Sequence, residues 1–237
     1  MKKYLLLILT VFFISANSQI KALTEDGKEI ILFDNKTWKF VNESDEKTLA
    51  EIKNNDKIFE KSKDATFLMK SKKMNSGIYF NPKKWKIVNG GLTSPFIDYV
   101  FNNVSDSNLF AILGSENAPV QTLKNIKDLV IASVQRNTDY FRLKESEYRT
   151  INNIKVLYMN YVANAKGIDF EYIGNYYLTS EGYSSVTAYT FGNKYEENKV
   201  ELENFINGIT KTEKSTKSDT VEEVIYTNPP PPMIKNK

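Results

Sequence analysis

The sequence predicts an α+β fold in which helices sandwich an antiparallel sheet. Three strand-like segments follow one another at residues 154–163, 168–179 and 183–191, and short turns that contain glycine separate them. Residues 120–138 and 196–209 instead repeat apolar side chains at spacings of three and four, which is typical of amphipathic helices. The chain has 237 residues, of which 41% are hydrophobic, so it is long enough for one sizeable domain.

The first 18 residues have the pattern of a secretory signal peptide. Lysines precede an apolar run from Tyr4 to Ile14, and Ala16 and Ser18 form a small-x-small cleavage site. The run is shorter than the roughly 20 apolar residues that a bilayer-spanning helix needs. We therefore expect residues 1–18 to be removed, which leaves no transmembrane segment. The chain has no cysteine for a lipid anchor, so the expected product is soluble, exported to the periplasm or the cell exterior, and not a lipoprotein.

Residues 19–41 predict a small β-meander. The pair Asp26-Gly27 is a strong hairpin turn, and a second turn at residues 34–36 separates two further stretches that alternate apolar and polar side chains. The next segment, residues 42–64, is rich in Glu, Lys, Asn and Asp. It predicts a polar linker or an exposed helix.

Residues 65–212 form the predicted main α+β domain. Before the helix at 120–138, the segments 95–101 and 108–113 predict two buried strands. The last segment, residues 213–237, is polar and ends in four consecutive prolines, so it predicts a disordered or extended tail. The prolines also match the ligands of proline-recognising grooves, although a solvated spacer has the same composition.

Composition excludes several kinds of chemistry. The chain has neither histidine nor cysteine, which removes the usual Ser-His-Asp and Cys-His catalysis and most zinc sites. Its 32 basic and 29 acidic residues nearly balance, so charge gives no reason to expect a nucleic acid partner. Neither a phosphate-binding glycine loop nor a calcium loop occurs. We expect no catalytic residue, cofactor or metal site of these types.

The main domain resembles the PsbP-like family. The resemblance rests on Ile78-Tyr79-Phe80-Asn81-Pro82-Lys83-Lys84-Trp85, on Asn152-Asn153-Ile154, and on Tyr176-Tyr177-Leu178-Thr179 before a closing helix. It implies an α/β/α sandwich around an antiparallel sheet and an accessory or binding role. Asn153 stands where many members have glycine. The meander is similar to a "DG…DGTW" pattern of exported bacterial proteins, with Asn35-Lys36 in place of the second Asp-Gly.

Six residues are candidates for a ligand or partner surface. Tyr161 and Tyr177 lie in the tyrosine-rich strands, where aromatic rings can stack on a ligand or fill the core. Trp38 and Trp85 follow turns and can be binding platforms or buried anchors. Asp169 and Glu171 are two residues apart on one strand and therefore share a face, as a carboxylate pair of a glycosidase would.

The leading hypothesis is an exported, non-catalytic accessory or binding protein of the cell envelope, whose partner is an unknown envelope protein or a small ligand. A carboxylate-based glycan hydrolase using Asp169 and Glu171 is an alternative from another class. A purely structural envelope protein, in which the meander and the tail act as spacers, is a further alternative.

Overall fold

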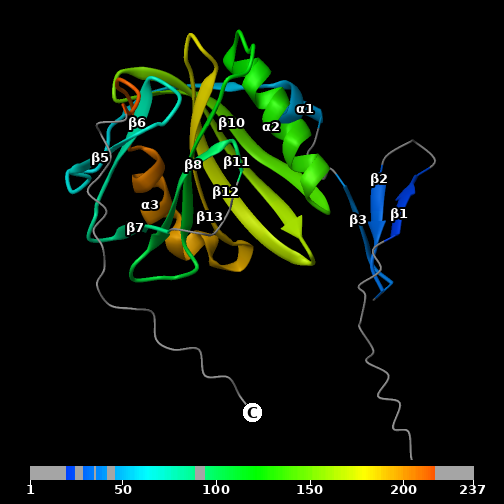
Figure 1. Cartoon of the computed structure of the whole chain (residues 1–237). Coiled ribbons are helices and arrows are strands. Elements are labelled where there is room, and N and C mark those ends of the chain that lie inside the picture. The colour runs from blue at the N-terminus through cyan, green and yellow to red at the C-terminus, as the bar shows by residue number, and fades with distance from the viewer. Residues whose placement is uncertain (1–19, 25–28, 35, 42–45, 89–93, 217–237) are drawn as a thin grey trace, which may run out of the picture.

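A computed structural model describes residues 20–24, 29–34, 36–41, 46–88 and 94–216. The expected signal peptide, the Asp26-Gly27 turn and the proline run lie outside these residues. The described chain forms an eight-stranded sheet in the order β4-β10-β11-β12-β13-β9-β8-β7 (Figure 1). Its strands are β4 (Lys53–Phe59), β7 (Trp85–Ile87), β8 (Ile97–Asn103), β9 (Phe110–Glu116), β10 (Tyr140–Ile151), β11 (Ile154–Ala165), β12 (Ile168–Leu178) and β13 (Tyr183–Phe191).

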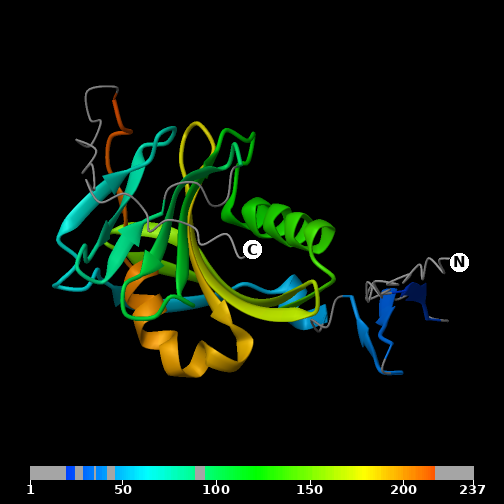
Figure 2. The same cartoon turned by 60° about the horizontal axis from the view of Figure 1, so that its bottom comes forward.

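Helices cover both faces of this sheet, as Figure 2 shows with α2 in green above it and α3 in orange below. Helix α2 (Leu123–Asn137) packs Ile126 and Val130 on one face, and α3 (Tyr195–Ile206) packs Leu202 and Phe205 on the other. A short turn of 3₁₀ helix, η1 (Gly192–Lys194), leads into α3. The predicted α+β sandwich is therefore confirmed.

The long strands β10 to β13 are joined by tight hairpins. Asn152 and Asn153 both have positive φ, at 47° and 65°, and form the turn from β10 to β11. Two left-handed residues in succession give a turn whose twist matches the strands, and asparagine tolerates that conformation better than most residues. Asn153 can thus adopt the left-handed conformation that glycine adopts most readily. The Asn152 amide also donates to the carbonyl oxygens of Asn207 and Ile209, each at 2.8 Å, and so fixes the end of α3.

A second sheet of three strands flanks α3 in the order β14-β6-β5. It consists of β5 (Phe67–Lys70), β6 (Ser76–Phe80) and β14 (Ile209–Lys211). Gly208 precedes β14, and a Cβ at this position would lie 1.9 Å from the Tyr79 carbonyl oxygen. Only glycine allows the chain to leave α3 and pair at once with β6.

The N-terminal meander forms a separate three-stranded antiparallel sheet of β1 (Ile20–Leu23), β2 (Glu29–Leu32) and β3 (Trp38–Phe40). It lies beside the start of β10, at the right of Figure 1. Ile31 and Val41 pack against Tyr140, and the Phe141 backbone N–H donates to the Val41 carbonyl oxygen at 2.6 Å. A small sheet needs such a contact because it cannot bury enough apolar surface alone.

Residues 46–64, within the segment expected to be a linker or a helix, contain both the short helix α1 (Glu46–Ala50) and the strand β4. Strand β4 pairs in parallel with β10, which builds this segment into the main sheet. Its composition did not predict a strand because an edge strand needs few apolar residues. Lys127 of α2 is buried and donates to the carbonyl oxygens of Thr48 and Glu51 at 3.0 and 2.7 Å, which ties α2 to α1.

Candidate functional site

A cleft of about 870 Å³ lies where the meander meets the main sheet. The ends of β10, β11 and β12 form its floor, β2–β3 residues flank one side, and the turn before α3 flanks another. Five charged side chains line it: Lys39, Arg142, Asp169, Glu171 and Lys194. The structure thus brings the two carboxylates of the predicted pair into one cleft together with three basic residues.

Asp169 is held in one orientation by two donors. Its Oδ1 accepts hydrogen bonds from the Tyr140 hydroxyl and from the Asn164 amide, the latter at 2.5 Å. Its Oδ2 lies 3.8 Å from the Lys39 ammonium, which is an ion-pair distance longer than a hydrogen bond. Asp169 is therefore a fixed carboxylate with acceptor capacity left for a ligand.

Glu171 is deeper in the sheet and is 5% exposed. Its Oε1 accepts a hydrogen bond from the Lys144 ammonium at 2.6 Å, and the same ammonium lies 5.3 Å from the centre of the Tyr195 ring of α3. The buried charge of Glu171 is thus compensated inside the protein. Glu171 contributes charge and shape to the cleft floor rather than a free carboxylate.

The cleft also holds polar side chains that sequence reasoning missed. Arg142, Asn108 and Asn193 line it, and their side chains make no hydrogen bond or ion pair with other described residues. They come from β10, from the loop before β9 and from the turn before α3. Only the folded chain brings them together, so no spacing in the sequence could have grouped them. Phe33, Tyr140 and Phe191 add aromatic rings to the same lining.

The predicted tyrosines do not share a surface. Tyr161 is 5% exposed and belongs to the core beneath α2, whereas Tyr177 packs against the core beneath α3. The two side chains lie on opposite faces of the sheet because Tyr161 opposes Tyr172, and Tyr172 and Tyr177 are an odd number of residues apart on β12. Burial raises the pKa of the Tyr161 hydroxyl well above its usual value.

The two tryptophans have different surroundings. Trp85 is buried at 2% exposure, its ring centre lies 4.4 Å from that of Phe205, and its indole N–H donates to Glu201 Oε1 at 2.8 Å. It is a core anchor between β7 and α3. Trp38 is 52% exposed on β3 and packs edge-on against Phe40. Neither of them lines the cleft.

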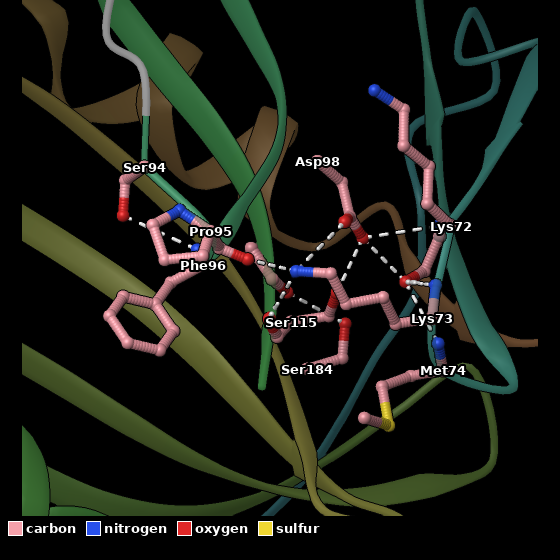
Figure 3. A network of polar contacts seen from close by, with 11 residues as sticks. Lys72, Lys73, Met74, Ser94, Pro95, Phe96, Asp98, Ser115 and Ser184 are labelled. Carbon is pink, nitrogen blue, oxygen red and sulfur yellow. Dashed lines mark hydrogen bonds and ion pairs between the residues drawn. The ribbon is translucent and has the colours of Figure 1, made fainter. Parts of the chain in front are cut away.

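A second polar cluster surrounds Asp98 of β8, where the small sheet meets the main one (Figure 3). Asp98 Oδ2 accepts from the hydroxyls of Ser71 and Ser115 at 2.5 and 2.6 Å. The Lys73 ammonium lies 4.0 Å from Oδ1 and donates to the carbonyl oxygens of Pro95 and Ser115. The hydrogen bonds to Oδ2 come from both sheets, from Ser71 next to β5 and from Ser115 of β9, so the cluster acts as a joint between the sheets. Oδ1 is buried and has the Lys73 ion pair but no hydrogen bond among the described residues.

The described residues contain no group of three His, Cys, Asp or Glu side chains placed to hold a metal ion. No described helix has both the length and the apolar character that crossing a bilayer requires.

Comparison with known proteins gives similarities of fold. No family model matches the chain, and no curated protein matches it. The solution structure of CyanoP, the PsbP of the cyanobacterium Synechocystis, has a TM-score of 0.49 at 11% identity, covering 63% of this chain and 94% of that chain. PA94 of Pseudomonas aeruginosa, described as a protein of unknown function, has a TM-score of 0.38 at 8% identity, covering 51% and 78%.

Proposed function

We propose that the protein is an exported, non-catalytic binding protein of the cell envelope, and that its ligand occupies the cleft beside Asp169. The signal-peptide pattern of residues 1–18 supports export. The observation that carries the binding role is the cleft itself, about 870 Å³ in volume and lined by polar side chains from three separate parts of the chain. Concave sites with a few convergent polar groups are typical ligand sites.

The lining favours a ligand with many hydroxyl groups, and we assign an oligosaccharide as the ligand class. Asp169 Oδ2 offers an oriented acceptor, while Arg142, Asn108 and Asn193 offer side chains that make no hydrogen bond to other described residues. A sugar ring presents alternating donors and acceptors that such groups can satisfy, and its apolar face can contact an aromatic ring.

Binding agrees better with these contacts than hydrolysis does. A glycosidase needs one carboxyl group that gives up a proton and a second that attacks or activates water. Here Asp169 is held by Tyr140 and Asn164, and Glu171 is held by Lys144. Glu171, bonded to Lys144 and only 5% exposed, is not accessible to a bound sugar as the second carboxyl group of a glycosidase must be.

The test is a titration of the secreted chain, starting at residue 19, with chito-, malto-, cello- and mannooligosaccharides and with muropeptides. We expect at least one of them to raise the melting temperature and to bind in calorimetry. Arg142→Gln should weaken that binding about 10-fold or more, because a charge-assisted hydrogen bond is worth about 1.5–3 kcal/mol. Arg136→Gln, at the exposed end of α2, is the matched control and should bind as the wild type does.

No stabilisation by any of these sugars would contradict the ligand class. Release of a free reducing end during the titration would contradict the non-catalytic role and favour the hydrolase. Export is tested separately by fractionating the producing cells and sequencing the N-terminus of the mature product, which we expect to be Gln19.

A further inference from the structure

A row of stacked aromatic rings crosses the main sheet on the face that carries α2. Tyr161, Tyr172, Tyr189 and Phe110 occupy directly paired positions on β11, β12, β13 and β9. Successive ring centres lie 5.0, 4.8 and 5.4 Å apart, with interplanar angles of 10°, 26° and 20°. We call these four residues the aromatic row.

One end of the aromatic row lies beneath α2, and the rest of the row lies beyond the helix. Tyr161 is buried in the core beneath the helix, whereas Tyr172, Tyr189 and Phe110 are only partly buried. Among the described elements, α2 packs its apolar side chains over β10, β11 and β12; Tyr183 is the β13 residue that joins this core, and no residue of β9 joins it. Phe170 and Phe191 form a second stacked pair beside the row, with ring centres 5.1 Å apart. Phe170 also meets Tyr189 edge-on at 6.1 Å, so the row and this pair form one continuous patch of partly buried aromatic rings.

The spacing of the row suits a polyproline II segment. One turn of that helix holds three residues and is about 9 Å long, which equals about two strand spacings of about 4.8 Å. Every third residue of such a segment can therefore meet every second ring of the row. Aromatic surfaces recognise proline-rich segments in this way, because the ligand is already ordered and loses little conformational entropy on binding.

The chain itself carries such a segment. Residues 229–232 are four consecutive prolines near its C-terminus. The described chain ends at residue 216, and the Ser215 N–H donates to the Ser71 carbonyl oxygen at 2.8 Å, next to the Asp98 cluster of β8. Strand β8 is the neighbour of β9, the strand that carries Phe110.

The connecting chain is long enough to reach the row. Residues 217–228 separate the last described residue from the first of the four prolines. At up to about 3.3–3.6 Å per residue, an extended chain of this length spans about 40 Å or more. The eight-stranded sheet is about 34 Å wide at about 4.8 Å per strand spacing, so every strand lies within reach.

We propose that the aromatic row is the docking surface for Pro229–Pro232 of the same chain. Bound there, the four prolines contact the partly buried rings of Tyr172, Tyr189 and Phe110. The proposal is independent of the ligand cleft, because no residue of the aromatic row lines the cleft.

The test compares two full chains that differ only in the tail, the wild type and the variant with Pro229, Pro230, Pro231 and Pro232 all changed to serine. A fluorescent peptide with the sequence of residues 226–235 is titrated against each chain and followed by anisotropy. We expect the peptide to bind the serine variant at least 10-fold more tightly than the wild type, because the wild-type tail competes for the row. Adding Tyr189→Ala to the serine variant should weaken the peptide at least 10-fold.

Tyr189→Thr keeps a good strand-forming residue and serves as a second variant if the alanine form folds poorly. Trp38→Ala, which removes an exposed ring of β3 that is not part of the row, is the control and should leave peptide binding unchanged. Equal affinity of the two chains, absence of binding, or insensitivity to both Tyr189 variants would overturn the proposal. Dimers that form only when the prolines are present would contradict binding within one chain. They would show instead that the tail binds the row of a second copy.

Discussion

Asp98 and Asp169 bond to the same kinds of groups but differ in how far their side chains are exposed to solvent. Each accepts hydrogen bonds from two side chains and lies about one ion-pair distance from a lysine, at 4.0 Å from Lys73 and 3.8 Å from Lys39. The Asp98 side chain has 0% of its surface exposed, whereas that of Asp169 has 43%. The kinds of bonding partners therefore do not distinguish the two aspartates, whereas their exposure to solvent does.

The difference shows that access to solvent decides what a fixed carboxylate can do. The side chain of Asp98 is closed off from solvent and bonds to serines of both sheets, so its interactions hold the two sheets together (Figure 3). Asp169 has a similar set of donors on one oxygen and the cleft beside it, so its free acceptor is available to a ligand. The two sites should consequently respond differently to the same substitution.

The largest effect is expected for Asp98→Ala. The change removes the acceptor of two serine hydroxyls and leaves Lys73 without its ion pair, and loss of one member of a buried charged network costs about 3 kcal/mol or more. Urea unfolding followed by circular dichroism measures it. Asp56→Ala, on an exposed position of β4, is the control and should change stability by less than about 0.5 kcal/mol. Equal losses for the two variants would refute the role of the Asp98 joint.

Ser115→Ala should have the next largest effect. It deletes one charge-assisted hydrogen bond to Asp98 Oδ2, which is worth about 1.5–3 kcal/mol. Ser71→Ala deletes the other bond to the same oxygen. Because the two hydroxyls share one acceptor, the double variant should lose a different amount from the sum of the two single losses. Strict additivity in urea unfolding would mean that the two serines act independently.

Asp169→Ala should cost only about 1 kcal/mol in stability, since the side chain is half-exposed and water replaces part of its bonding. Its effect on the cleft should be much larger, with oligosaccharide affinity reduced about 10-fold or more in calorimetry. Asp128→Ala on α2, which removes an exposed carboxylate paired with Lys124, should change neither quantity appreciably. If the Asp169→Ala variant lost stability but kept its oligosaccharide affinity, the role of Asp169 would be structural, as that of Asp98 is.

Asp64 extends the comparison to an exposed carboxylate and should have the smallest effect. Hydrogen bonds from Ser62 and Asn81, with the nearby Lys84, lower its pKa to about 2. A carboxyl group whose pKa is lower in the folded state stabilises the protein above its unfolded pKa of about 4, and this contribution disappears as the pH falls toward 2. Asp64→Asn should flatten the stability profile slightly between pH 4 and pH 2 in urea unfolding. Parallel profiles of the two proteins would show that Asp64 contributes nothing.

Much of the fold could be predicted because its strongest patterns are local. The segments 154–163, 168–179 and 183–191 became β11, β12 and β13 with ends shifted by at most two residues. Strand β10 was missed. Its sequence carries the charged residues Arg142, Lys144, Glu145, Glu147 and Arg149, a composition typical of a solvated segment. The fold pairs all of them except Arg142 with opposite charges. Glu147 accepts from Arg149 Nε at 2.6 Å, and the Arg149 guanidinium lies 3.4 Å from the Tyr158 ring centre.

The candidate site was predicted only in part. The spacing of Asp169 and Glu171 predicted a shared face, and both residues line the cleft. The meander residues and Arg142 join them only through tertiary contacts, which no local pattern encodes. Asp98 did have a local signal, a lone carboxylate in the apolar run from Phe96 to Phe101, and that signal was overlooked. A charged residue inside a buried strand requires buried partners.

Strand β4 has a consequence for how the folded chain meets its neighbours at high concentration. It closes one edge of the main sheet, and its Lys53, Asn54, Asn55 and Asp56 are polar or charged. The opposite edge is β7, which has three residues. Unpaired edges are where separate molecules add strands to one another, and short or charged edges resist this. Self-association through backbone pairing is therefore disfavoured at both edges of the main sheet, so the folded chain should resist aggregation by strand addition there.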